Sequence, residues 1–273
     1  MYGLAYSIND PAGDGIARVL RDKLGLSESS SCRNSETCFQ GANVVLAGFR
    51  EDVIYFDFLD ERMPRETEIY IVLSRHSSEA KVKSYTVHHT GNFSDNAQYG
   101  GNPGELGISS PKVSWLILRA LSESWRVSNR VEYEVSYEAT HHGPTSLSKP
   151  IVFVEIGSSV EEWSDTLNHF FVASSIIKLL ESPSADCKPV IGVGGGHYPR
   201  KHTDLALKEN VCYGHIIPKY ALQHLSYETL DKMISRSDID IKEIIVEKKG
   251  TRVEHRSLIE DYASRTGIEV RYV

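Results

Sequence analysis

Histidine is the residue type most suggestive of chemistry in this 273-residue chain, which contains eleven of them. Six lie in short segments that also carry glycine: His88-His89, His141-His142 and the stretch from His197 to His202. Neutral imidazole binds zinc and exchanges protons near neutral pH, so each segment is a candidate for metal binding or acid–base work. Adjacent side chains project to opposite sides of an extended chain. We therefore expect one member of each adjacent pair to face a site and the other to be structural.

A carboxylate and a glycine run add to these histidines. Glu155 ends an apolar run, where an unpaired charge is costly to bury, so zinc, a histidine or a backbone amide must be its partner. Three consecutive glycines before His197 let the backbone approach a ligand and turn its amides inward, as in an oxyanion or phosphate cradle. A tight strand-to-helix turn is the alternative. The run comprises Gly194, Gly195 and Gly196.

These patterns define three sets of candidate residues. The predicted catalytic residues are His141, His142, His197 and Glu155. The predicted metal ligands, with zinc as the metal, are His88, His89, His142, Glu155, His197, His202 and Asp204. The predicted substrate contacts are Gly194, Gly195, Gly196, Arg75, His76, Thr90 and Asn92, together with the basic residues Lys248, Lys249, Arg252 and Arg256.

Common catalytic motifs are absent from the sequence. It has no GxSxG and no HExxH, which disfavours the usual serine hydrolases and thermolysin-like peptidases. The glycine run lacks the Lys and Ser/Thr of a P-loop and the spacing of GxGxxG, which argues against nucleotide binding on those motifs. Attack by water, aided by histidine and metal, is the simplest remaining mechanism.

The net charge of -7 argues against a protein that coats nucleic acid nonspecifically. Only a local basic patch could bind RNA, and the C-terminal basic residues are the best candidates; a solvated charged face is the alternative.

No apolar run reaches membrane-spanning length and no signal peptide is evident, so we expect a cytoplasmic protein without membrane contact. The four cysteines are then expected to be reduced thiols, with a Cys32–Cys38 clip as the less favoured alternative.

Strands alternate with helices along the chain, which predicts one α/β domain over residues 1–273 with a mostly parallel sheet covered on both sides. Ligands bind such sheets outside the carboxyl ends of the strands, and five of the predicted strand ends carry His, Arg or Glu at or just after the strand. Ser27–Gln40 and Asn92–Ser110 are predicted to be loops, and Glu161–Glu181 the longest helix. The predicted strands are Tyr2–Ser7, Asn43–Gly48, Val53–Asp57, Ile69–Ser74, Ser84–His88, Val131–Ala139, Ile151–Glu155, Lys188–Val193, Tyr213–Ile217, Glu243–Glu247 and Gly267–Val273.

Five motifs together resemble the D-aminoacyl-tRNA deacylases of archaea and plants. They are AYSINDPAG from Ala5, HHTGN from His88, EATHHGPT from Glu138, VEIGSS from Val154 and GVGGGHYPRKHTD from Gly192. The resemblance extends over nearly the whole chain.

This resemblance implies a three-layer α/β/α fold with a mixed central sheet, related to phosphorylases and peptidyl-tRNA hydrolases. It also implies zinc and a tRNA partner carrying a D-amino acid, whose ester bond to the terminal adenosine is hydrolysed in translation quality control. A metallopeptidase, a nucleoside phosphorylase-like enzyme and a noncatalytic tRNA-binding module are the alternatives. The sequence leaves open the zinc stoichiometry, the amino-acid preference, the means of excluding L-aminoacyl-tRNA, the identity of the base and the oligomeric state, with a monomer compatible.

Overall fold

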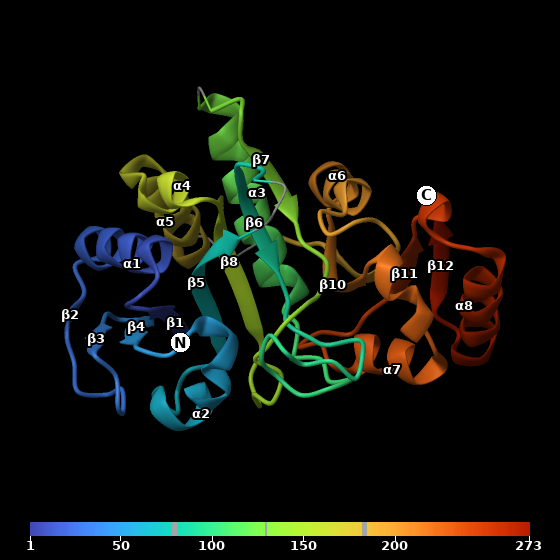
Figure 1. Cartoon of the computed structure of the whole chain (residues 1–273), viewed down its shortest axis with the longest axis horizontal. Coiled ribbons are helices and arrows are strands. Elements are labelled where there is room, and N and C mark those ends of the chain that lie inside the picture. Colours follow the sequence, from blue (N-terminus) through green and yellow to red (C-terminus); the bar gives the residue numbers. More distant parts are fainter. Residues whose placement is uncertain (78–80, 129, 182–184) are drawn as a thin grey trace.

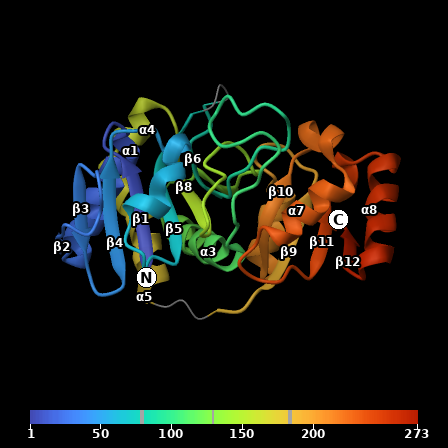
Figure 2. The same ribbon diagram turned by 90° about the horizontal axis from the view of Figure 1, so that it is seen from below.

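Two β-sheets stand side by side in the protein (Figures 1 and 2). The computed structural model describes residues 1–77, 81–128, 130–181 and 185–273. The first sheet has the order β2-β3-β4-β1-β5-β8-β6-β7 and the second the order β10-β9-β11-β12. The strands are β1 (Tyr2–Ser7), β2 (Ser27–Glu28), β3 (Thr37–Gln40), β4 (Val44–Phe49), β5 (Ile69–Ser77), β6 (Ser84–His88), β7 (Glu134–Tyr137), β8 (Ile151–Ser158), β9 (Lys188–Val193), β10 (Val211–Ile217), β11 (Glu243–Val246) and β12 (Glu269–Tyr272).

The direction of the strands reverses once in the middle of the first sheet. Strands β4, β1, β5 and β8 run parallel, whereas β6 is antiparallel to β8 and parallel to β7. The second sheet is parallel throughout. The expected mixed, mostly parallel α/β architecture is confirmed, although its strands are divided between two sheets.

The two faces of the first sheet are covered differently. Helices α1 (Pro11–Leu24), α3 (Pro111–Val127) and α5 (Thr166–Glu181) pack on one face. Side chains alternate along each strand, so Leu73 and Val154 join this helix-covered core while Val72 and Phe153 point to the other face. That face is covered by the 3₁₀ helix η1 (Val53–Phe58), by α2 (Leu59–Arg62) and by loops.

Helix α3 links the cores under the two sheets. The Trp115 indole is fully buried and donates a hydrogen bond to the Ala206 carbonyl in α6 (Arg200–Glu209), which packs on β10. Helix α7 (Tyr227–Ser235) also packs on β10, and α8 (Val253–Thr266) packs on β12. The short elements are α4 (Val160–Ser164), η2 (Lys219–His224) and η3 (Lys248–Gly250).

Three predicted elements differ in the structure. Val53–Asp57 is the 3₁₀ helix η1 rather than a strand, since Val53 and Phe56, three apart, share its buried side. Ser27–Gln40 contains the short strands β2 and β3. The helix predicted over Glu161–Glu181 is interrupted at Asp165, whose extended backbone separates α4 from α5.

The expectation of reduced thiols is wrong, because all four cysteines are paired. Cys32 bonds to Cys38, with Cα atoms 5.9 Å apart, and Cys187 bonds to Cys212, with Cα atoms 5.6 Å apart. The second pair connects the segment before β9 with the neighbouring strand β10. Pairing of β9 with β10 could not be inferred from the cysteine spacing. Within the described residues, no helix has the length and apolarity required to cross a membrane.

Candidate functional site

The candidate site lies on the face of the first sheet opposite to α1, α3 and α5, where the strand direction reverses. Side-chain alternation places Ser74 and His76 of β5 on this face, and Ser74 is the register partner of Glu155 in β8. Strand β6 pairs antiparallel with β8 and ends with His88 opposite Phe153, also on this face. A buried, otherwise apolar surface therefore carries imidazole and carboxylate groups from three adjacent strands.

Glu155 has the partners that its burial requires. Its carboxylate accepts a hydrogen bond of 3.0 Å from the Ser74 hydroxyl, and it lies 3.2 Å from His76 Nδ1 and 3.6 Å from His88 Nε2. Burial alone would raise the pKa of Glu155, but the hydrogen bonds and charges of His76 and His88 outweigh it and lower the pKa. The carboxylate is therefore ionised next to the imidazoles.

A second carboxylate, Glu138, was not among the predicted site residues. It follows β7, and its side chain is fully buried. One oxygen lies 3.1 Å from His76 Nδ1, while the other lies 2.8 Å from His197 Nε2 and 3.5 Å from His141 Nε2. In the sequence it begins the EATHHGPT motif, three residues before His141, but neither the motif nor the spacing reveals these long-range contacts.

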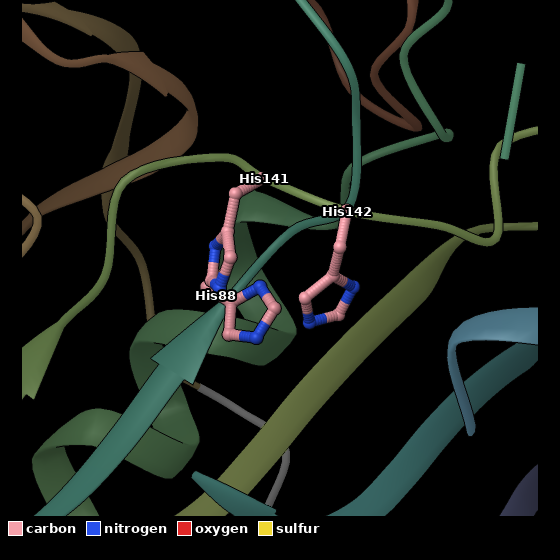
Figure 3. A group of neighbouring side chains, drawn as sticks. All are labelled: His88, His141 and His142. Carbon is pink, nitrogen blue, oxygen red and sulfur yellow. The ribbon is translucent and has the colours of Figure 1, made fainter. Parts of the chain in front are cut away.

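His88, His141 and His142 converge, as Figure 3 shows, with His88 at the tip of β6 and the other two on the loop after β7. In each ring Nδ1 donates to a backbone carbonyl, at 3.2, 2.8 and 2.6 Å respectively. Because Nδ1 carries the proton, Nε2 of each neutral ring is unprotonated, and its lone pair is available to a ligand. This tautomer, fixed by a carbonyl, is the usual arrangement of metal-binding histidines.

The expectation that one member of each pair faces the site holds for His88-His89 and fails for His141-His142. His89 is buried elsewhere, with Nδ1 bonded to the Gly214 carbonyl and Nε2 accepting from the Ser110 amide, so neither nitrogen is free for a metal. His142 has a φ of 43°, and its departure from extended backbone removes the alternation on which the expectation rested.

His76 connects the two carboxylates to a tyrosine. Its Nδ1 faces Glu138 and Glu155, and its Nε2 lies 2.8 Å from the Tyr198 hydroxyl. Burial opposes protonation, but the hydrogen bonds and charges of Glu138 and Glu155 prevail and raise the pKa of His76 to about 11. In contrast, burial and the neighbouring His88 lower the pKa of His142 to about 4. Tyr198 was not singled out in the sequence, because its partner is 122 residues away.

Two further predicted metal ligands lie outside the cluster. His202 in α6 is buried against β10, where its Nδ1 lies 3.1 Å from the Tyr213 hydroxyl. Asp204 is largely exposed and pairs with Lys208 one helical turn away. With His89, these residues are structural or solvated rather than candidate ligands, because they do not join the groups of donor atoms described here.

The glycine run forms a turn rather than a lining of the site. Gly194 and Gly195 have φ values of 99° and 86°, which favour glycine. The Gly194 amide donates to the Ile217 carbonyl, and the Gly195 carbonyl accepts from the Lys219 amide, so the Gly194 amide cannot serve a ligand. The geometry favours the tight-turn alternative. The turn positions His197, whose carbonyl accepts from the Ala139 amide.

A cavity of about 940 Å³ opens over the cluster. His76, His141, His142, Glu155 and His197 line it, as do the predicted contacts Arg75 and Asn92; Gly194, Gly195, Gly196, Thr90 and the C-terminal basic residues do not. The Thr90 hydroxyl instead donates to the Pro144 carbonyl. A buried cluster beneath a large cavity can receive a substrate and water at the same time.

The donor atoms of the cluster fit a divalent cation. His88 Nε2 and both carboxylate oxygens of Glu138 are buried without an aligned hydrogen bond among the described residues, an expensive situation unless a cation satisfies them. Three groups have donor atoms within 4.8 Å of one another: His88 with His141 and His142; His76 with Glu138 and His197; and His88 with Glu138 and Glu155. Imidazole with carboxylate is a donor set suited to zinc and other divalent transition metals.

Comparison with known proteins gives one consistent result. The family model described as D-aminoacyl-tRNA deacylase matches residues 63–271. Proteins named D-aminoacyl-tRNA deacylase from Staphylothermus marinus and Desulfurococcus amylolyticus are 57% and 58% identical, over 100% of this chain and 99% and 100% of theirs. That of Pyrococcus furiosus is 35% identical over 95% of each chain. A crystal structure of a conserved protein of unknown function matches with a TM-score of 0.92 at 31% identity, covering 100% of this chain and 95% of that one.

Proposed function

The chain belongs to the D-aminoacyl-tRNA deacylase family, and from this premise we propose that its histidine and glutamate cluster is the catalytic centre. The reaction is hydrolysis of the ester that joins a D-amino acid to tRNA, which releases the free amino acid and tRNA for renewed use in translation. The observation that carries the assignment of the centre is the placement of His141, His142 and His197 under the large cavity, backed by two ionised carboxylates.

We propose zinc as the resident metal, held by His88, His141 and His142 with a carboxylate from Glu155 or Glu138. Support comes from the three Nδ1 to carbonyl bonds, which fix the tautomer with Nε2 available, and from the unsatisfied buried donor atoms of His88 and Glu138. Zinc, when bound, would act as a Lewis acid and make water a stronger nucleophile at neutral pH.

His197 is the best placed of these residues to move a proton. Its ring is about a third exposed to the cavity, and its Nε2 lies 2.8 Å from a Glu138 oxygen, a contact that fixes the orientation of the ring. In hydrolysis a bond forms between the water oxygen and the ester carbonyl carbon, and the bond between that carbon and the ribose oxygen breaks. His197 would accept the proton from water and return it to the ribose oxygen.

The predicted contact of tRNA with the C-terminal basic residues stays a proposal. Lys248, Lys249 and Arg252 are exposed at the end of β11, and Gly250 beside them packs on the Gly194 turn. That turn is bonded to η2, part of which lines the cavity. The basic residues therefore extend outward from the rim of the site, where they could contact phosphates of the acceptor stem despite the net charge of -7. Arg256 is less available, because it donates to the Thr251 carbonyl.

The metal proposal is tested by measuring zinc content and deacylation together. Protein purified without chelator should contain zinc, should lose hydrolysis of D-aminoacyl-tRNA after verified metal removal, and should regain it with added zinc. Matched L-aminoacyl-tRNA serves as the substrate control. Unchanged activity in fully metal-free protein would overturn the zinc centre and would leave catalysis to the histidines and carboxylates.

The tRNA surface is tested with the quadruple alanine variant of Lys248, Lys249, Arg252 and Arg256. Because each phosphate contact releases counterions, the variant should bind all tRNAs more weakly and with a shallower salt dependence, whereas its preference for D over L should persist. Identical affinity and slope in wild type and variant would return these residues to the solvated-face interpretation.

A further inference from the structure

Two exposed tyrosines stand at the cavity without an assigned role. Tyr99 is 63% exposed and Tyr220 is 57% exposed, and both line the cavity over the histidine cluster. Large aromatic side chains left open to solvent forgo the stabilisation of burial, which makes them candidates for binding a ligand. Tyr55, by contrast, is 54% exposed on η1 and does not line the cavity.

Both tyrosines are held close to the catalytic residues. The Tyr99 carbonyl accepts a 3.0 Å hydrogen bond from the Gly143 amide, next to His142. Its loop is braced by Asn92, whose side-chain amide donates to the carbonyls of Gly100 and Asn102. This loop lies between α2 and α7 in Figure 1.

Tyr220 approaches the cluster from the second sheet. It belongs to η2, which follows β10. Its side chain lines the cavity together with His141 and His197, and more than half of it remains open to solvent. Tyr99 and Tyr220 therefore flank the catalytic centre from different parts of the chain.

The chemistry of the substrate places a nucleobase next to the reacting ester. The ester that is hydrolysed is attached to the ribose of the terminal adenosine, so the adenine lies only one sugar away from the reacting carbonyl. Unpaired bases of RNA are recognised by stacking on aromatic rings and by hydrogen bonds to their edges. Gln98 and Gln223, which also line the cavity, provide amide groups of the kind that pair with an adenine edge.

We propose that Tyr99 and Tyr220 form the subsite for the base of the terminal adenosine, with their ring faces as the stacking surfaces. The inference rests on the assignment of the cluster as the catalytic centre. The unpaired end of tRNA would enter between the 92–104 loop and η2, and stacking would fix the ribose ester over the imidazoles.

The test compares two D-aminoacyl-tRNAs that differ only in the last nucleotide, which carries adenine in one and no base in the other. Single-turnover hydrolysis is followed across protein concentrations for wild type, Tyr99→Ala, Tyr220→Ala and the double variant. Tyr220→Phe keeps the ring, and Tyr55→Ala is the matched control for loss of an exposed tyrosine. Thermal unfolding verifies that each variant is folded.

In wild type, removal of the base should raise the half-saturating concentration by about tenfold or more, since stacking contributes on that scale. The double alanine variant should treat the two substrates alike, whereas Tyr220→Phe and Tyr55→Ala should discriminate as wild type does. Terminal 2-aminopurine in uncharged tRNA should lose fluorescence on binding wild type but not the double variant.

Equal binding of both substrates by wild type, or full discrimination by the double variant, would overturn the subsite. Failure of the catalytic assignment would appear differently. His141→Ala should lower the maximal rate on both substrates equally and keep the discrimination between them. A normal rate in that variant would show that the assignment of the catalytic centre is wrong, and it would leave the subsite unaffected.

Discussion

Two groups of histidines in the same molecule contrast in how their nitrogens are used. His89 and His215, whose rings lie 6.0 Å apart, have both nitrogens within hydrogen-bond distance of polar groups of the surrounding fold. His88, His141 and His142 use Nδ1 in this way, whereas Nε2 of His88 and of His141 lies 3.6 and 3.5 Å from the carboxylates of the cluster. Residue type is shared, and His88 is as buried as His89 and His215, so neither residue type nor burial alone identifies a site. The state of the second nitrogen separates a structural histidine from a candidate ligand.

His88 and His89 show how local this distinction is. They are adjacent in sequence, and both are at most 3% exposed. The end of β6 directs His88 toward Phe153 and Glu155, and it directs His89 toward Ser110, which precedes α3, and Gly214 in β10. One peptide step therefore separates the proposed catalytic cluster from the contacts between the two sheets.

The largest predicted effect comes from removing a histidine of the cluster. His141→Ala or His142→Ala should lower the single-turnover rate at least about a hundredfold, because a catalytic or ligating group is lost. His215→Gln, which can keep hydrogen bonds in the structural group, should leave the rate nearly unchanged. Zinc content and melting temperature are measured on the same samples. Near-normal rates in both alanine variants would remove the contrast between the groups.

A smaller effect is expected from removing a tyrosine hydroxyl that contacts a histidine, either in the cluster or outside it. Tyr198→Phe removes the partner of His76 Nε2 and should weaken zinc binding by roughly tenfold, the effect expected for a group that orients a cluster residue. The control, Tyr213→Phe, removes the similar contact with His202 and should cost about 1 kcal/mol of unfolding free energy without changing zinc affinity. Competition with a chelating dye measures the affinity. If both variants changed the zinc affinity equally, the contact of Tyr198 with His76 would have no specific role in metal binding.

The smallest predicted effect is a pH dependence of stability from the structural group. Burial lowers the pKa of His89 to about 3 and that of His215 to about 4. The unfolded chain binds these protons near pH 6.5 and the folded chain does not, so the stability present above pH 6.5 declines as the pH falls toward 4. Each histidine should contribute a loss of about 0.7 kcal/mol between pH 7 and pH 6.

Urea unfolding of wild type and His215→Gln at several pH values measures this contribution. The variant should lose less stability on acidification by about the amount of one histidine. Parallel pH profiles for the two proteins would mean that His215 is not held neutral by the fold.

Local sequence patterns were sufficient to predict the alternation of strands and helices and several members of the site. His141, His142, His197 and Glu155 all line the cavity, because each follows or ends an apolar strand that had to be buried. The strand error at Val53–Asp57 arose because a short apolar run fits a strand and a 3₁₀ turn equally well. Spacing alone cannot assign partners, so His89 and His202 were indistinguishable from ligands.

Glu138 and Tyr198 could not be predicted because their importance depends on contacts between distant segments. Glu138 reaches the cluster only when β7 pairs with β6, and Tyr198 only when the turn after β9 meets β5. The positive φ of His142 is likewise a property of the folded loop and leaves no mark in the residue order.

The long separations within the cluster have a consequence for how the enzyme matures. Ser74 bonds to Glu155 across 81 residues and Tyr198 contacts His76 across 122, so the centre consists of contacts of high contact order. Such contacts form late, after the cost of closing long loops has been met. A nascent chain still lacking β9 and the turn after it has no complete centre. Deacylation therefore begins only after the chain through the turn that follows β9 has folded onto the first sheet.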